Sequence, residues 1–223
     1  MIFPPLIFLI MFLFFVFTLV LLPFLLVGMI GNAFMKLGLS PAMIFWLLIL
    51  TLLGSLVNIP LTRLKGAEVV VQEEIRYFGM RVRLPRQRLH RETILAVNVG
   101  GALIPAGLSF YLLTQMGVGK GLLLNLAIVT AVMYYLARPI KGLGIAVPAL
   151  VPPLLAAVGA YLLCPAELRA PCAYIASTLG ILIGADLLHL KDVAQLGAPV
   201  ASIGGAGTFD AIFLGGIIAV LLS

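Results

Sequence analysis

Seven apolar stretches, each long enough to cross a bilayer, limit what this chain can fold into. A membrane-spanning helix needs about 20 apolar residues, with about 17 to 25 as the usual range. The chain is 63% hydrophobic and only 10% charged, whereas about 25% of the residues of a soluble domain are charged. We therefore expect one all-α integral membrane domain over residues 1–223 with about seven transmembrane helices. The stretches are 3–31, 41–61, 93–116, 121–137, 145–163, 173–190 and 199–222.

The basic residues are distributed unevenly between the two sides that these spans define. Segment 62–92 is rich in arginine, and placing it in the cytoplasm also puts Arg138, Lys141 and Lys191 inside. Only Lys36, Lys120 and Arg169 then lie outside. Because positive loops stay in the cytoplasm, we expect a multi-pass inner-membrane protein with its N-terminus in and its C-terminus out. This placement explains the net charge of +6 without nucleic acid, so membrane lipids are the expected partners.

The basic segment 62–92 shows the pattern of a small cytoplasmic β-hairpin. Residues 80–84 alternate strictly between apolar and basic side chains, and they follow a glycine at position 79. Period-two alternation after a glycine turn is typical of a hairpin with one basic face. Its role is either to anchor the topology or to contact anionic lipid or gate a membrane site.

Cys164 and Cys172 fall in one short loop on the expected outer side. Because that side is oxidising, we expect a disulfide between them, with two free thiols as the alternative. Two thiols without a nearby histidine do not make a zinc site.

Two aspartates lie within the last two apolar stretches, where an ionisable group is costly and usually functional. Asp186 is four residues before the end of the sixth stretch, and Asp210 follows a glycine-rich run in the seventh. That run, 202–207, is expected to enter the membrane as irregular backbone that lines a cavity. Thr208 is a suitable N-cap, which places Asp210 in the first helical turn. The two carboxylates then come from adjacent antiparallel spans at similar depth and are able to face each other.

Two carboxyls that share a water are the minimal machinery of an aspartic protease, in which one is ionised and the other protonated. The helix N-terminus favours a negative charge on Asp210, so Asp186 is the expected protonated partner. The alternative is structural: Asp210 satisfies backbone N–H groups, and Asp186 pairs with Arg138, Lys141 or His189. A metal held by Asp186, Asp210 and His189 is not expected, because the only other histidine lies in the basic segment.

Two resemblances involve the same residues. The segments 184–188 and 202–210, together with 58–61 and 100–105, are similar to a prokaryotic polytopic membrane-protein family catalogued as a domain of unknown function. More distantly, the two aspartates resemble those of GxGD-type intramembrane aspartyl proteases, the presenilin and signal-peptide-peptidase group. In that group the second aspartate directly follows Gly-x-Gly, whereas Thr208 and Phe209 intervene here. The group's Tyr-Asp is Ala185-Asp186 here, and its Pro-Ala-Leu follows the aspartates, whereas residues 148–150 precede them.

A transporter interpretation uses these residues differently. The segment 99–102 is similar in sequence to 203–206, and both belong to spans that are expected to run outward. Paired glycine-broken helices, here expected near Gly100-Gly101 and near 204–207, expose backbone groups to ions in many transporters. Asp186 and Asp210 would then be proton or cation sites, and a non-catalytic scaffold is the third alternative. Besides the catalytic pair, the expected binding residues are Asn98, Gly204, Gly205, Gly207 and Thr208.

The leading hypothesis is therefore an intramembrane aspartyl protease with an Asp186/Asp210 dyad. It requires no cofactor and no metal. Its expected substrate is a transmembrane peptide, whereas the transporter alternative implies a small ion.

Overall fold

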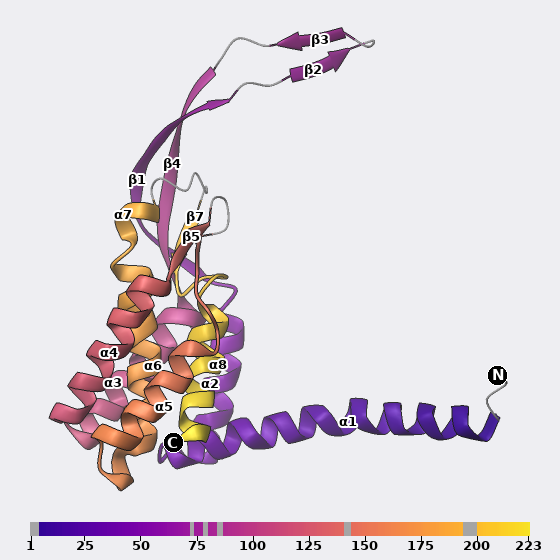
Figure 1. Ribbon diagram of the computed structural model, residues 1–223, viewed down its shortest axis with the longest axis vertical. Coiled ribbons are helices and arrows are strands. Elements are labelled where there is room, and N and C mark those ends of the chain that lie inside the picture. The colour runs from indigo at the N-terminus through magenta and orange to yellow at the C-terminus, as the bar shows by residue number, and fades with distance from the viewer. Residues whose placement is uncertain (1–4, 72–73, 78–79, 84–86, 141–143, 194–199) are drawn as a thin grey trace.

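The computed structural model describes residues 5–71, 74–77, 80–83, 87–140, 144–193 and 200–223. These residues form a mostly helical fold with small β-sheets (Figure 1). Most helices lie side by side as a bundle, and a long β-ribbon rises from one end of it. The eight α-helices of the described residues are α1 (Pro5–Lys36), α2 (Pro41–Gly54), α3 (Ile104–Met116), α4 (Lys120–Leu136), α5 (Val151–Leu163), α6 (Arg169–Ile181), α7 (Leu190–Val193) and α8 (Phe209–Leu222).

Two helical stretches are long and apolar enough to cross a membrane. One is Val99–Met116, in which the π-helix η1 (Val99–Leu103) continues into α3. The other is Ala166–Asp192, which joins the short 3-10 helix η2 (Ala166–Leu168), α6, the π-helix η3 (Leu182–Leu187) and α7. Leu25–Lys36 and Pro41–Gly54 make a third if this pair, bent by 117°, is counted as one span.

The expectation of seven spans is therefore not met in the described part of the chain. Apolar helices α4, α5 and α8 are present but shorter. The physical reason is that strands and turns occupy the ends of several apolar stretches. Strand β4 (Gln87–Asn98) takes the start of the third stretch, and β7 (Val200–Ile203) with a glycine-rich turn takes the start of the seventh.

Helix α6 lies at the centre of the bundle. Helices α3, α4, α5 and α8 all pack against it. In the stretch Ala166–Asp192, which contains α6, 78% of the 18 most apolar consecutive residues are buried, compared with 39% in Val99–Met116. Small residues allow this approach: a Cβ at Gly180 would lie 2.5 Å from Val129 of α4, and one at Gly184 would collide with the carbonyl of Thr130. Close packing through small residues is typical of membrane helices.

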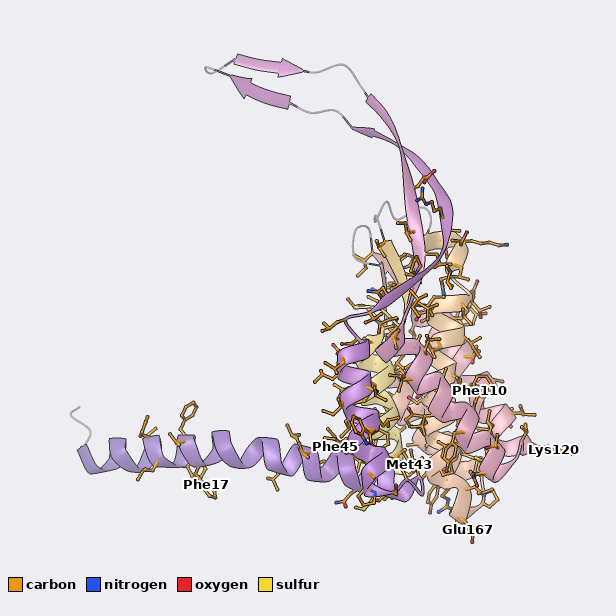
Figure 2. All side chains as sticks on the ribbon, turned by 180° about the vertical axis from the view of Figure 1, so that it is seen from behind. Phe17, Met43, Phe45, Phe110, Lys120 and Glu167 are labelled. Atoms are coloured by element: carbon orange, nitrogen blue, oxygen red, sulfur yellow. The ribbon has the colours of Figure 1, made fainter. Side chains whose placement is uncertain are left out.

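The outer surface of the bundle is apolar, as expected if lipid is the solvent. Phe110, Phe45 and Met43 project outward from α3 and α2 (Figure 2) and are 62%, 59% and 44% exposed. Lys120 and Glu167, both exposed, lie at the end of the bundle that is opposite the ribbon. Helix α1 projects sideways from that same end (Figure 1).

The expected hairpin is present as strands and is longer than predicted. Strand β1 (Asn58–Val71) pairs antiparallel with β4, and β2 (Glu74–Tyr77) pairs with β3 (Met80–Arg83) beyond them. The ribbon thus begins and ends inside stretches that were expected to be helical. Strand β7 adds parallel to β4, which gives the sheet order β1-β4-β7. A separate pair, β5 (Arg138–Ile140) and β6 (Gly144–Ala146), lies at the same end of the bundle.

Candidate functional site

Two similar segments enter the site side by side. Strand β4 leads into η1 and α3, and its parallel neighbour β7 leads through a glycine-rich turn into α8. In the paired strands, Val97 lies opposite Ile203. The sequence similarity between 99–102 and 203–206 instead aligns Val99 with Ile203, so the strand pairing is offset by two residues from the sequence alignment. The irregular backbone that was expected near 204–207 is present as this turn, whereas residues 100–101 are helical: they lie in the π-helix η1, which continues into α3 without a break.

The two glycine segments touch each other directly after the paired strands. A Cβ on Gly101 would collide with the carbonyl oxygen of Gly204, and a Cβ on Gly204 would lie 2.5 Å from the carbonyl carbon of Gly101. Gly204 also has a φ of +68°, a conformation that favours glycine. The N–H of Gly205 bonds to the carbonyl of Ser202 at 3.0 Å and closes the turn. Only glycine therefore fits at Gly204.

Asp186 lies on η3, where α6 continues as π-helix, and only 4% of it is exposed. Its Oδ2 accepts hydrogen bonds from the backbone N–H of Gly204 at 2.7 Å and from the hydroxyl of Thr208 at 3.1 Å. Within the described ranges, Oδ1 has no hydrogen-bond partner and no basic side chain pairs with this carboxyl. One oxygen is therefore held in place, and the other is free to meet a ligand.

The alternative ion pairs of Asp186 are not formed by the basic groups that the structure describes. Arg138 makes no ion pair with it. The Nδ1 atom of His189 lies 3.1 Å from the carbonyl oxygens of both Gly184 and Ala185. Lys141 lies outside the described residues. His189 therefore bonds to its own helix rather than to the carboxylate.

Thr208 occupies the N-cap position of α8, as predicted, but its hydroxyl makes no capping hydrogen bond. The hydroxyl is directed to Asp186 instead. Asp210 lies in the first turn of α8, also as predicted, and it is exposed. The start of α8 thus supplies the Thr208 hydrogen bond to Asp186 and also carries Asp210.

A cavity of about 570 Å³ lies at this junction, at the strand end of the bundle. Asp186 and Asp210 both line it, and so do the other residues expected to bind, Asn98, Gly204, Gly205, Gly207 and Thr208. Its lining as described includes no lysine, arginine or histidine. The described residues contain no group of three or more histidine, cysteine or acidic side chains suited to a metal ion. The described lining of the cavity thus carries two acidic side chains and no basic one, together with several apolar side chains.

A network of amide side chains forms part of the cavity wall. The Nδ2 of Asn98 donates to the carbonyl of Ser55 at 2.7 Å and to Oδ1 of Asn58 at 3.1 Å, and its Oδ1 accepts from the N–H of Gly101 at 2.7 Å. The hydroxyl of Ser202 donates to the same Oδ1 of Asn58 at 2.6 Å. Sequence reasoning missed Ser55, Asn58 and Ser202 as site residues. The usable signal was their polarity at the edges of otherwise apolar stretches.

The two cysteines lie away from this cavity, where α5 gives way to α6: Cys164 directly follows α5, whereas Cys172 lies in the first turn of α6 and not in the expected loop. Both are buried, and their thiols interact, but the structure has them as free cysteines. The disulfide is not formed in this structure and stays a prediction.

Comparison with known proteins identifies a family for most of the chain. Residues 52–222 match the family described as "Protein of unknown function (DUF1614)", and the chain therefore belongs to that family. No match was found among curated proteins or among solved structures. The likeness to GxGD-type proteases therefore depends only on the residues quoted above.

Proposed function

We propose that this DUF1614-family protein hydrolyses peptide bonds at the membrane, with Asp186 and Asp210 as its two acidic groups. The observation that supports this proposal best is that both carboxyls line one cavity of about 570 Å³, although 24 positions separate them in the sequence. One of them is buried and the other exposed. Unequal surroundings are what allow two carboxyls to take different protonation states.

The hydrogen bonds of Asp186 suggest which carboxyl acts as the general acid and which as the general base. Because Oδ2 already accepts two hydrogen bonds, a proton on this carboxyl belongs on Oδ1. In the proposed reaction, Asp210 removes a proton from water, and the water oxygen attacks the peptide carbonyl carbon. Asp186 donates its proton to the carbonyl oxygen. As the tetrahedral intermediate collapses, Asp186 takes back the proton of one hydroxyl, the C–N bond breaks, and the amine leaves with the proton that Asp210 took from water.

The test is cleavage of a Leu/Ala-rich transmembrane peptide, labelled with a fluorophore and a quencher, in liposomes that contain the purified protein. Asp186→Asn and Asp210→Asn should each lower the rate by about 10²–10⁴-fold, the usual contribution of a general acid or base. Asp192→Asn is the matched control, because Asp192 is exposed on α7 and is not part of the cavity lining. Folding is checked by thermal unfolding. Cleavage at the wild-type rate by either cavity variant would exclude the dyad.

A cation or proton pathway is the second candidate, and a different observation favours it. The cavity combines two carboxylates with amide and hydroxyl oxygens, and its described lining has no basic group to neutralise them. Intramembrane carboxylates of this kind often bind protons or cations. If the protein cleaves no peptide but carries protons or sodium ions into liposomes in a way that depends on Asp186, the pathway replaces the protease. If both aspartate variants behave as wild type in each assay, the scaffold alternative is favoured.

A further inference from the structure

We infer that Asn58 is a ligand-binding residue whose side-chain N–H groups donate to a carbonyl oxygen of a peptide in the cavity. This inference deepens the proposed function and depends on it for the identity of the ligand. Asn58 lies at the start of β1 and lines the same cavity as Asp186 and Asp210.

The orientation of the Asn58 amide follows from its neighbours. Asn98 sits between two backbone groups of fixed character: the N–H of Gly101 can only donate, and the carbonyl of Ser55 can only accept. The oxygen of Asn98 must therefore face Gly101, and its nitrogen must face Ser55. That same nitrogen lies 3.1 Å from the Asn58 amide and must donate to it, so the Asn58 atom that it meets is the oxygen.

Ser202 strengthens this assignment. Its hydroxyl donates to the same oxygen of Asn58 at 2.6 Å. With two donors on Oδ1, the amide of Asn58 is fixed by its oxygen end. Its Nδ2 carries two N–H groups, and no hydrogen bond from them is formed within the described part of the chain. The residue is exposed, so these donors remain available to a molecule in the cavity.

The turn after β7 connects this donor to the carboxylates. Ser202 holds Asn58, and two residues later the N–H of Gly204 holds Asp186. The amide donor and the buried carboxylate are thus supported by the same short stretch of backbone. A peptide carbonyl oxygen needs a hydrogen-bond donor, and ionised carboxylates can only accept hydrogen bonds. The free N–H groups of Asn58 supply a donor in the same cavity.

The experiment measures peptide binding and peptide cleavage separately. The probe is the same labelled Leu/Ala-rich peptide. Its dissociation constant is measured by fluorescence anisotropy in nanodiscs with Asp210→Asn protein, which removes turnover and leaves the Asn58 hydrogen bonds in place. Asn58→Asp keeps the oxygen that accepts from Asn98 and Ser202 but has no N–H. Asn58→Ala removes both functions without adding charge. Asn32→Asp, at an exposed position on α1, is the matched control for the change of charge.

Both Asn58 variants should raise the dissociation constant about tenfold, the upper range for one neutral hydrogen bond, and Asn32→Asp should leave it unchanged. In protein that retains Asp210, Asn58→Asp should lower kcat/KM for cleavage by a similar factor while its thermal unfolding stays as in wild type. Binding within twofold of the reference protein by both variants would overturn the inference, and so would failure of the reference protein to bind the peptide. If binding depends on Asn58 but no cleavage occurs, the inference stands and the proposed hydrolysis fails.

Discussion

The hydroxyl of Thr208 lies 3.1 Å from Oδ2 of Asp186 and donates to it, although Thr208 occupies the N-cap position of its own helix. A threonine at that position usually accepts a hydrogen bond from the first helical turn. Here the capping bond is absent and the hydroxyl ties the start of α8 to η3. Since Asp210 follows two residues later, this bond fixes the part of the chain that carries the second carboxylate beside the first.

Removing the Thr208 hydroxyl should therefore weaken function while the fold persists. Thr208→Val keeps the shape of the side chain but leaves Oδ2 with only the Gly204 N–H. Asp186 is the protonated partner in the proposed reaction, and a hydrogen bond to a neutral group contributes about 0.5–1.5 kcal/mol. We therefore expect about a two- to tenfold loss of peptide cleavage. Thr208→Ser keeps the donor and is the matched control, with activity close to wild type. Equal activity of the valine and serine variants would show that the bond does not position Asp186.

How much of this site could be predicted depended on local signals. Asp186 and Asp210 stand out because charges are rare in apolar stretches, and the glycine run indicated irregular backbone between them. The amide network was not predictable in the same way. Asn58 meets Ser202, which is 144 positions away, and Asn98 meets Ser55 across 43 positions. No local pattern encodes such contacts, because they arise from strand pairing.

The number of spans was predicted wrongly for a related reason. Apolarity marks burial from water but does not distinguish a buried strand from a buried helix. Residues 93–98 and 200–203 were assigned to spans, yet they pair as β4 and β7. Both contain β-branched residues, Thr93, Ile94 and Val97 in one and Val200 and Ile203 in the other, and such residues favour strands. That composition was the available clue.

Replacing Gly101, which packs directly on Gly204, should lower the stability of the fold far more than replacing a glycine that has no neighbour within 4 Å. In Gly101→Ala the new methyl group meets the carbonyl oxygen of Gly204, which is backbone and has no room to move without separating the two segments. We expect a loss of several kcal/mol of stability, in the range of severe overpacking. Gly107→Ala on α3 is the control, because nothing lies within 4 Å of its Cβ position. Alanine there should stabilise the helix by up to about 1 kcal/mol.

Thermal unfolding in detergent measures both glycine variants. The expected order of midpoints is Gly107→Ala at or above wild type, and Gly101→Ala well below it. If Gly101→Ala unfolds at the wild-type temperature, the close contact between η1 and the turn at Gly204 is not a feature of the folded protein.

The two cysteines allow a test of the predicted disulfide. Protein isolated without reductant should, once denatured, react with a maleimide only after a reducing agent is added. A bond that closes so short a loop contributes about 2–3 kcal/mol in the loop-entropy account, so Cys164→Ser should lower the unfolding temperature of protein kept without reductant. With reductant present, that variant and wild type should differ less. Labelling of both thiols by denaturation alone would show that they remain free, as in the structure.

The orientation in the membrane is open to a direct test, because the ribbon and the C-terminus lie at opposite ends of the bundle (Figure 1). Positive charge concentrated in segment 62–92 predicts that the ribbon is cytoplasmic, so Ser223 should be outside. Alkaline phosphatase fused after Ser223 should be active, and green fluorescent protein fused at the same position should be dark. Trypsin should cut the arginine-rich segment in inside-out vesicles and leave it intact in right-side-out vesicles. The reverse pattern in both assays would place the acidic cavity at the outer face instead, and its peptide would then have to come from that side.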